Sequence, residues 1–153
     1  MKVVERLSAN IESMATLVPV LGVKTAATII AGAGDPRQYG SAKALVKAVG
    51  LNLRTYSSGK RKPGKLHITK RGSGMTRMML FMAALRLIKS DRVVRAWYEA
   101  KVARSGGRKM PAIVAIMRKL VSSLWYVARG HAFDTRKLFD AERLGLAPVS
   151  ALP

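Results

Sequence analysis

The spacing of apolar residues along the chain is mostly that of α-helices. Between residues 3 and 14 the apolar positions fall on one face and predict a short amphipathic helix: Val4, Leu7, Ile11 and Met14. The following stretch, 15–33, is apolar enough to suggest a membrane helix, but polar and helix-breaking residues interrupt it: Pro19, Gly22, Lys24 and Gly32. It therefore predicts two short buried helices joined by a tight turn at Leu21–Gly22, the second running from Lys24 to Ala31.

Capping residues predict further helices in the rest of the chain. Ser41 can cap a helix that runs to Val49, with Gly50 after its end. A helix over residues 73–89 carries a stripe that we expect in the core, because methionine fills irregular gaps: Met75, Met78, Met79, Met82 and Leu85. Ser90 or Asp91 can cap the next helix, which runs to about Ala103.

A last helix is predicted from Pro111 to Gly130, since proline suits a first helical turn and glycine a helix end. Its apolar positions mark one buried face: Ile113, Ile116, Met117, Leu120, Leu124 and Val127. Beyond Asp134 the periodicity is weak, and residues 136–153 are expected to form a loosely ordered tail.

Residues 51–72 lack helical periodicity. Leu53–Tyr56 and Leu66–Thr69 can each form a short strand, with the sequence SSGKRKPGK between them. The predicted fold class is therefore mainly α: a helical domain with one long basic loop or short β-hairpin.

Charge changes this picture, because the formal net charge is +20 and no acidic residue lies between Asp35 and Asp91. A basic stretch of this length favours a polyanionic partner, and nucleic acid is the first candidate, although scattered Lys and Arg can also form a solvated basic face. An anionic membrane is not expected, because no helix pairs a wide apolar face with a Lys-rich face and aromatic anchors.

The chain has no cysteine, which excludes disulfides, Cys-ligated zinc and a thiol nucleophile, and suits the cytoplasm. Its eight acidic residues are not grouped with metal-ligand spacing, so no metal site and no cofactor are predicted.

The first predicted hairpin resembles a helix-hairpin-helix motif, in which backbone N–H groups of a glycine turn face a DNA phosphate. Gly22 would allow the close approach, Lys24 would add charge, and Thr25 would cap the helix or donate a hydrogen bond. Val20 stands where the motif usually has another glycine. An ordinary helix corner is the alternative.

The stretch YSSGKRKPGKLHITKRG, residues 56–72, holds two adjacent serines before a run of cations. These cations can hold a phosphate and stabilise transition-state charge: Lys60, Arg61, Lys62, Lys65, Lys70 and Arg71. Ser57 or Ser58 would then be a nucleophile, although serine needs activation. From composition alone, a loop that only binds phosphate is the favoured interpretation, and the nucleophile is the alternative. His67 is a general base or acid, another phosphate contact, or a packed residue.

The order of three segments is similar to one known family. They are VPVLGVKTAATIIAGAGDPRQYGSAKALVKAVGL, SSGKRKPGKLHITKRGSGMTRMMLFMAALR and WYEAKVARSGGRKMPAIVAIMRKLVSSLWYVARGHAFD. Together they resemble the C-terminal domain of transposases of the insertion-sequence one-ten family, which also contains the Piv-type DNA invertases. The resemblance assigns residues 1–15 to a linker helix at the end of a coiled segment, and residues 16–135 to the transposase domain.

The resemblance implies a site-specific DNA recombinase domain whose catalytic serine attacks a DNA phosphate. The family motif assigns that role to Ser58, with Ser57 as the fallback, and Arg77 and Arg86 would extend the basic track. Family members pair this domain with a RuvC-like domain that carries four acidic metal ligands, and members have been found to be guided by a bridge RNA.

The implied partners are therefore DNA, a guide RNA, a RuvC-like domain or subunit that holds the divalent metal, and further copies of the chain. The implied location is the prokaryotic cytoplasm, at the nucleoid. Three departures from the family pattern, at Val20, Leu53 and Ser73, indicate a divergent copy. No RuvC-like half is expected in this chain, so a non-catalytic nucleic-acid-binding module or a transposase remnant is the alternative.

Overall fold

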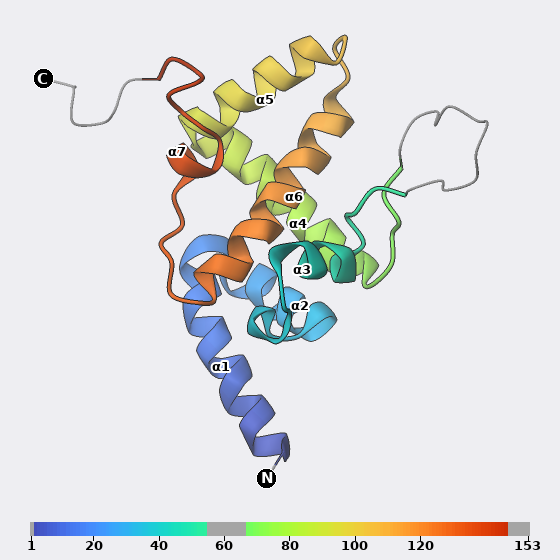
Figure 1. Cartoon of the computed structure of the whole chain (residues 1–153), viewed down its shortest axis with the longest axis vertical. Coiled ribbons are helices and arrows are strands. Elements are labelled where there is room, and N and C mark those ends of the chain that lie inside the picture. Colours follow the sequence, from blue (N-terminus) through green and yellow to red (C-terminus); the bar gives the residue numbers. More distant parts are fainter. Residues whose placement is uncertain (1, 55–66, 147–153) are drawn as a thin grey trace, which may run out of the picture.

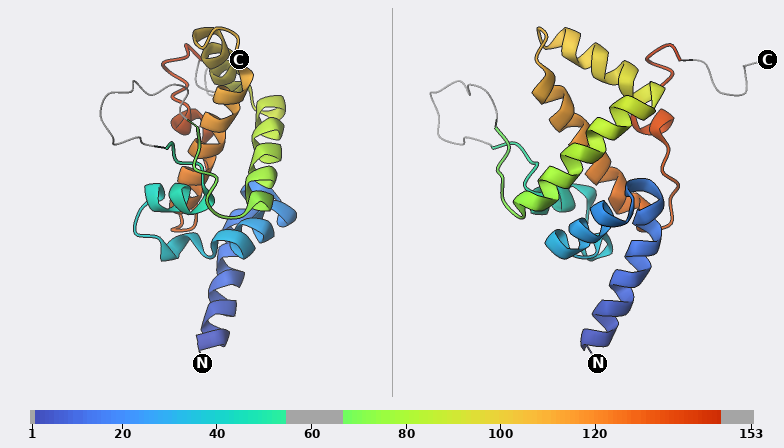
Figure 2. Two further views of the ribbon diagram at one scale, coloured as in Figure 1. Left: turned by 90° about the vertical axis from the view of Figure 1, so that its right-hand side faces the viewer. Right: turned by 180° about the vertical axis from the view of Figure 1, so that it is seen from behind.

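The computed structural model describes residues 2–54 and 67–146. Within them the chain forms helices and one short 3-10 turn, and the predicted mainly α fold is confirmed. The elements are α1 Lys2–Leu21, α2 Val23–Ala33, η1 Pro36–Gln38, α3 Ala42–Val49, α4 Gly74–Ser90, α5 Arg92–Arg104, α6 Lys109–Val127 and α7 Thr135–Leu138. α4 and α6 cross at the centre, and α1 extends away from them with the N-terminus at its far end (Figures 1 and 2).

α1 is one continuous helix with Pro19 in its last turn. The sequence predicted two helices in its place, one over residues 3–14 and a second that ends at Leu21. Pro19 has no N–H, so α1 lacks the bond that a residue here would donate to the Ala15 carbonyl, and Gly22, with φ +79°, then begins the turn into α2. The predicted boundary at residue 15 thus lies inside a helix. Ile11, on the predicted apolar face, is 70% exposed; the side chains of Val4 and Leu7 lie outside the described residues.

α2 packs closely on α4, and a glycine inside α2 makes this possible. A Cβ at Gly32 would lie 2.2 Å from Oγ1 of Thr76 in α4. Gly32 was predicted to help end the helix, but α2 continues to Ala33 and Gly34 follows as its C-cap.

The predicted caps of α3 and α5 are confirmed. The Ser41 side chain accepts a hydrogen bond from the Ala44 N–H, and Gly50 follows α3 in the left-handed conformation, φ +81°. Asp91 caps α5 by accepting from Val93 and Val94.

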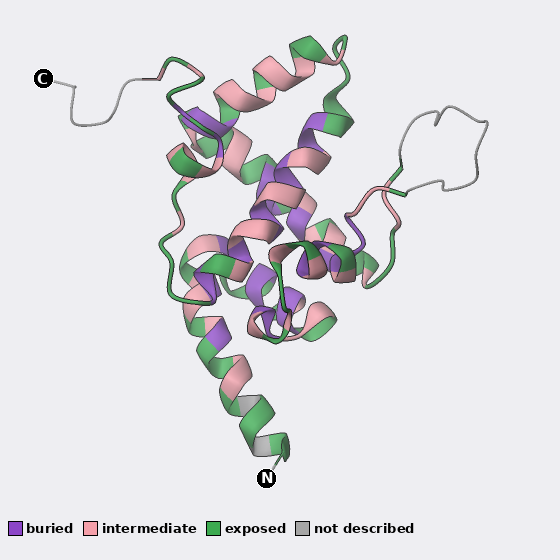
Figure 3. Ribbon diagram, viewed as in Figure 1, coloured by how far each residue is buried: buried purple, intermediate pink, exposed green. Residues whose placement is uncertain are grey.

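α6 is the central helix of the core, as predicted. All six residues of its predicted apolar face are buried, together with Ala112 and Val121. By length and composition α6 would also suit a membrane span. Its buried residues face α3, α4 and α5 instead, so its apolar character is explained by the core (Figure 3).

The methionines of α4 were predicted to be core residues, and this was wrong for most of the stripe. Met75, Met78 and Met82 are 58%, 52% and 49% exposed. The face of α4 that enters the core carries smaller residues and one leucine: Thr76, Leu80, Ala83 and Ala84. Small residues let α4 lie close to α2 and α6, and the long side chains therefore point away.

Part of the predicted loose tail is also packed. Phe139 is 1% exposed and its ring meets that of Trp97 edge-on at 5.4 Å. Ala141 is buried as well, and the Lys119 ammonium donates to the Leu138 carbonyl over 2.9 Å. Residues 136–146 therefore belong to the folded domain, because one aromatic side chain reaches the core; residues 147–153 lie outside the described residues.

Candidate nucleic-acid interface

The two described ends of the basic segment lie side by side. The Arg54 N–H donates to the His67 carbonyl over 2.9 Å, and the Thr69 N–H donates to the Asn52 carbonyl over 2.9 Å. A side-chain bond from Thr69 Oγ1 to Asn52 Oδ1, 2.7 Å, joins the same two segments. We call residues 52–54 and 67–72 the neck. It contains one isolated antiparallel bridge, Leu53 to Ile68, where the sequence predicted two short strands.

Two glycines hold the neck against α3. A Cβ at Gly50 would lie 1.9 Å from the Arg71 carbonyl oxygen, and one at Gly72 would lie 2.3 Å from the Ala48 carbonyl oxygen. The Lys70 N–H donates to the Gly50 carbonyl over 3.0 Å, with Lys70 itself at φ +55°. The backbones therefore touch directly, which only residues without a side chain permit.

Arg77 fixes the neck from the side of α4. Its Nη1 donates to the carbonyl oxygens of Arg71, Gly72 and Val49 at 3.0, 3.2 and 3.2 Å. The sequence suggested a phosphate contact for this residue. In the structure its Nη1 ties these three backbone segments together, and the phosphate contact stays a prediction.

Thr25 and Arg86 also have structural contacts. Thr25 is 1% exposed, and its Oγ1 accepts a hydrogen bond of 3.2 Å from Nη2 of Arg86. The same nitrogen donates to the Leu21 carbonyl at the end of α1 over 3.3 Å. Thr25 was expected to cap α2 or to contact a phosphate, but its side chain faces α4. Arg86 of α4 binds both helices of the hairpin, at Leu21 in α1 and at Thr25 in α2.

Gly22 and Lys24 remain accessible. Both are exposed, and no side chain caps the N-terminus of α2. Within residues 2–54 and 67–146, nothing lies within 4 Å of a Cβ built at Gly22. The backbone approach predicted for this turn is therefore open.

Exposed cations lie in the neck and on α3, which packs against it. They are Lys43 and Lys47, one turn apart on α3, with Arg54, Lys70 and Arg71 in the neck itself. Among the described residues, every ion pair involves Arg37, so none of these five side chains is neutralised by a carboxylate. Lys43, Lys47 and Arg54 all lie in the acid-free stretch, and the end of α3 that follows Lys47 contacts the neck.

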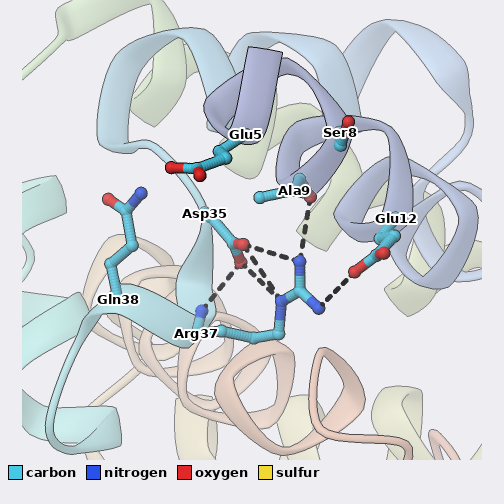
Figure 4. A pocket seen from close by; sticks show the side chains of 7 residues that line it. All are labelled: Glu5, Ser8, Ala9, Glu12, Asp35, Arg37 and Gln38. Carbon is cyan, nitrogen blue, oxygen red and sulfur yellow. Dashed lines mark hydrogen bonds and ion pairs between the residues drawn. The ribbon is translucent and has the colours of Figure 1, made fainter. Parts of the chain in front are cut away.

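One buried carboxylate was not singled out by the sequence analysis. Asp35 is 3% exposed and accepts hydrogen bonds from the Ser13 hydroxyl, 2.5 Å, and from the N–H and Nε of Arg37. Arg37 also pairs with Glu12 at 2.8 Å and donates to the Ala9 carbonyl (Figure 4). The sequence signal was the Asp-Pro pair after a helix, which is typical of a capped turn.

Burial raises the pKa of Asp35, but hydrogen bonds from Arg37 and Ser13 outweigh it, so the pKa lies below its usual value. Hydrogen bonds to Asp35 and Glu12 raise the pKa of Arg37. The network lines a shallow hollow between α1 and η1, together with Glu5, Ser8 and Gln38. This network joins α1 to the rest of the domain, because Ala9, Glu12 and Ser13 belong to α1 whereas Asp35 and Arg37 lie at η1.

The central nucleophile predictions lie outside the described residues. This applies to Ser57 and Ser58 and to four cations: Lys60, Arg61, Lys62 and Lys65. No group of metal-ligating side chains occurs among residues 2–54 and 67–146.

Exposed, unneutralised cations around an anchored neck suit a polyanionic ligand. The comparisons with known proteins then give the family: residues 13–99, more than half of the chain, match the model of the transposase IS116/IS110/IS902 family. The chain belongs to this family.

Two curated relatives agree with this assignment. An uncharacterised 43.6 kDa protein of insertion element IS110 from Streptomyces coelicolor is 29% identical over 77% of this chain and 29% of its own length. The transposase for insertion sequence element IS1111A from Coxiella burnetii is 33% identical over 71% of this chain and 30% of its own length. The chain thus spans about a third of the relatives that it matches. No solved structure matches it significantly.

Proposed function

We propose that this chain is a DNA-binding and strand-transferring part of an IS110-family transposase, equivalent to the family's C-terminal domain with Ser58 as nucleophile and Ser57 as fallback. The observation that carries the proposal is the neck. Its hydrogen bonds bring together Arg54 and His67, which flank the segment that contains Ser58. The exposed cations of the neck form no ion pair with a carboxylate among the described residues.

In the proposed step, Oγ of Ser58 attacks the phosphorus of a DNA phosphodiester. A phosphoserine ester forms, and the bond from phosphorus to one deoxyribose oxygen breaks. The leaving oxygen takes up a proton and becomes a hydroxyl, while the serine proton passes to a base. Lys and Arg side chains would stabilise the charge that develops on the phosphate oxygens.

We propose that a RuvC-like domain, on the same polypeptide or on another, completes the site and binds the divalent metal, while this chain binds none. DNA is the substrate, a guide RNA and further copies of the chain are the expected partners, and the nucleoid is the expected location. The turn at Gly22 and Lys24 would provide a second backbone contact to the nucleic acid, because both residues are exposed.

The test is the covalent product. The chain is incubated with a RuvC-like partner and a DNA whose cleaved strand cannot religate, and adducts that survive denaturant are separated on a gel. We expect an adduct with wild type and none with Ser58→Ala, while Ser8→Ala, an exposed serine of α1, serves as control. An adduct that survives Ser58→Ala and disappears with Ser57→Ala assigns the role to the fallback.

The second candidate function is a nucleic-acid-binding module without chemistry. The unneutralised cations favour it, because they attract any phosphate backbone whether or not a bond is cut. This module would bind DNA with a steep salt dependence, form no adduct, and lose no affinity when Ser58 is replaced.

A further inference from the structure

One face of α4 is apolar, and no described helix covers it. Met75, Met78, Met82 and Leu85 are 58%, 52%, 49% and 37% exposed, and we call these four residues the methionine stripe. Seen from behind, α4 lies in front of α6 with no other helix over it (Figure 2). A contiguous exposed apolar surface of this kind marks an interaction site more often than isolated exposed residues do.

The spacing of the stripe fits a second helix. Its members follow one another at intervals of three, four and three residues, which is the seam spacing of two helices packed side by side. The core-facing side of the same helix is already occupied by α2 and α6. Methionine side chains adapt to different partner surfaces, which suits a docking face better than a fixed core.

The charges around the stripe determine which helix fits. Arg86 and Lys89 are exposed near its C-terminal end, and Lys70 and Arg71 are exposed just before α4 begins. No acidic residue lies between Asp35 and Asp91 to neutralise them. A second copy of the chain would bring the same positive rim and a further charge of +20, so self-association through this face is opposed by repulsion.

We propose that the methionine stripe docks an acidic amphipathic helix of another protein, with apolar residues on one face and Glu or Asp beside them. The apolar seam would cover the methionines, and the flanking carboxylates would face Lys89 and the exposed part of the Arg86 guanidinium, whose Nη2 donates to Leu21 and Thr25. This proposal is independent of the nucleophile and of DNA binding.

The probe is a synthetic peptide of about three heptads with leucine at the seam positions and glutamate beside them, labelled with a fluorophore. Its binding to the whole chain is measured by fluorescence anisotropy. We expect Met78→Gln with Met82→Gln to weaken binding about tenfold, since the seam loses two central apolar contacts. Met110→Gln, at a methionine that is 56% exposed on α6, is the matched control and should leave the affinity unchanged. Circular dichroism confirms that both variants are folded.

A scrambled peptide of the same composition separates docking from mere charge attraction. If the scrambled peptide binds as tightly as the amphipathic peptide, the proposal is wrong. It is also wrong if the Met78→Gln, Met82→Gln double variant and the Met110→Gln control bind the amphipathic peptide with equal affinity. Sedimentation of the chain alone tests the other occupant: a dimer that dissociates on Met78→Gln with Met82→Gln would assign the stripe to a second copy and overturn the acidic partner.

Discussion

Two regions of this protein use their arginines and lysines in opposite ways. Where α1 joins the domain, Arg37 is paired with both Asp35 and Glu12, and Asp35 is buried. Around the neck, Lys47, Lys70 and Arg71 are exposed and have no carboxylate within ion-pair distance among the described residues.

The difference shows how a chain of net charge +20 remains folded while some of its cations stay available to bind a ligand. Cations that hold the fold together are satisfied inside the chain, by Asp35 at the α1 corner and by backbone carbonyls in the case of Arg77. Lys47, Lys70 and Arg71, which have no carboxylate partner among the described residues, lie at the end of α3 and in the neck.

The largest effect is expected from Gly50→Ala, which would break the neck. The new Cβ would meet the Arg71 carbonyl oxygen at 1.9 Å, and the residue has φ +81°. Strain and overlap together should lower the free energy of unfolding by about 4 kcal/mol, measured by urea denaturation. Gly107→Ala is the control, because Gly107 has φ +82° and nothing near its Cβ. Equal losses for both variants would show that the backbone contact is unimportant.

Asp35→Ala should break the hydrogen-bond network where α1 joins the domain. It leaves Arg37 and Ser13 without their shared acceptor and should lower the free energy of unfolding by about 2–3 kcal/mol. Glu99→Ala, at an exposed carboxylate in α5, should change it by less than about 0.5 kcal/mol. Similar unfolding curves for the two variants would mean that the network does not hold α1 in place.

Lys43→Gln with Lys47→Gln would test whether the lysines of α3, the helix that packs against the neck, contact nucleic acid. If both lysines contact phosphates, the salt dependence of DNA binding should flatten by about 2 in log K against log salt, since each phosphate contact contributes roughly 0.9. Lys109→Gln with Lys101→Gln, both away from the neck, is the matched control. If the slope of log K against log salt flattens equally in both double variants, the positive charge acts generally and the lysines of α3 have no particular role in DNA binding.

The smallest effect is a pH dependence that belongs to Asp35. The folded protein lowers the pKa of this carboxyl, so its contribution to stability is present above the unfolded pKa of about 3.9 and is lost as pH falls through the folded value. Between about pH 5 and pH 3 the free energy of unfolding should therefore fall further in wild type than in Asp35→Asn. Parallel pH profiles of the two proteins would contradict the assignment.

Local signals predicted much of the fold. The caps at Ser41 and Asp91 and the left-handed Gly50 act through hydrogen bonds between near neighbours in sequence, and they stand where the sequence indicated. The apolar face of α6 was also predicted correctly, because a helix that is buried along one side has apolar residues at helical spacing in its sequence. The acid-free stretch and the two serines before the basic run are likewise visible in the sequence alone.

Only the tertiary structure decided the parts that depend on distant neighbours. Whether the long side chains of α4 enter the core depended on how closely α2 and α6 approach it, and small residues at Gly32, Ala83 and Ala84 brought them near enough to leave the methionines outside. Arg77 and Arg86 have the composition of phosphate contacts, yet carbonyl groups from other segments bind them. The sequence by itself thus determined the helices, their caps and the sign of the charge. Packing determined which cations remained free, because pairing requires atoms that the chain brings together only when folded.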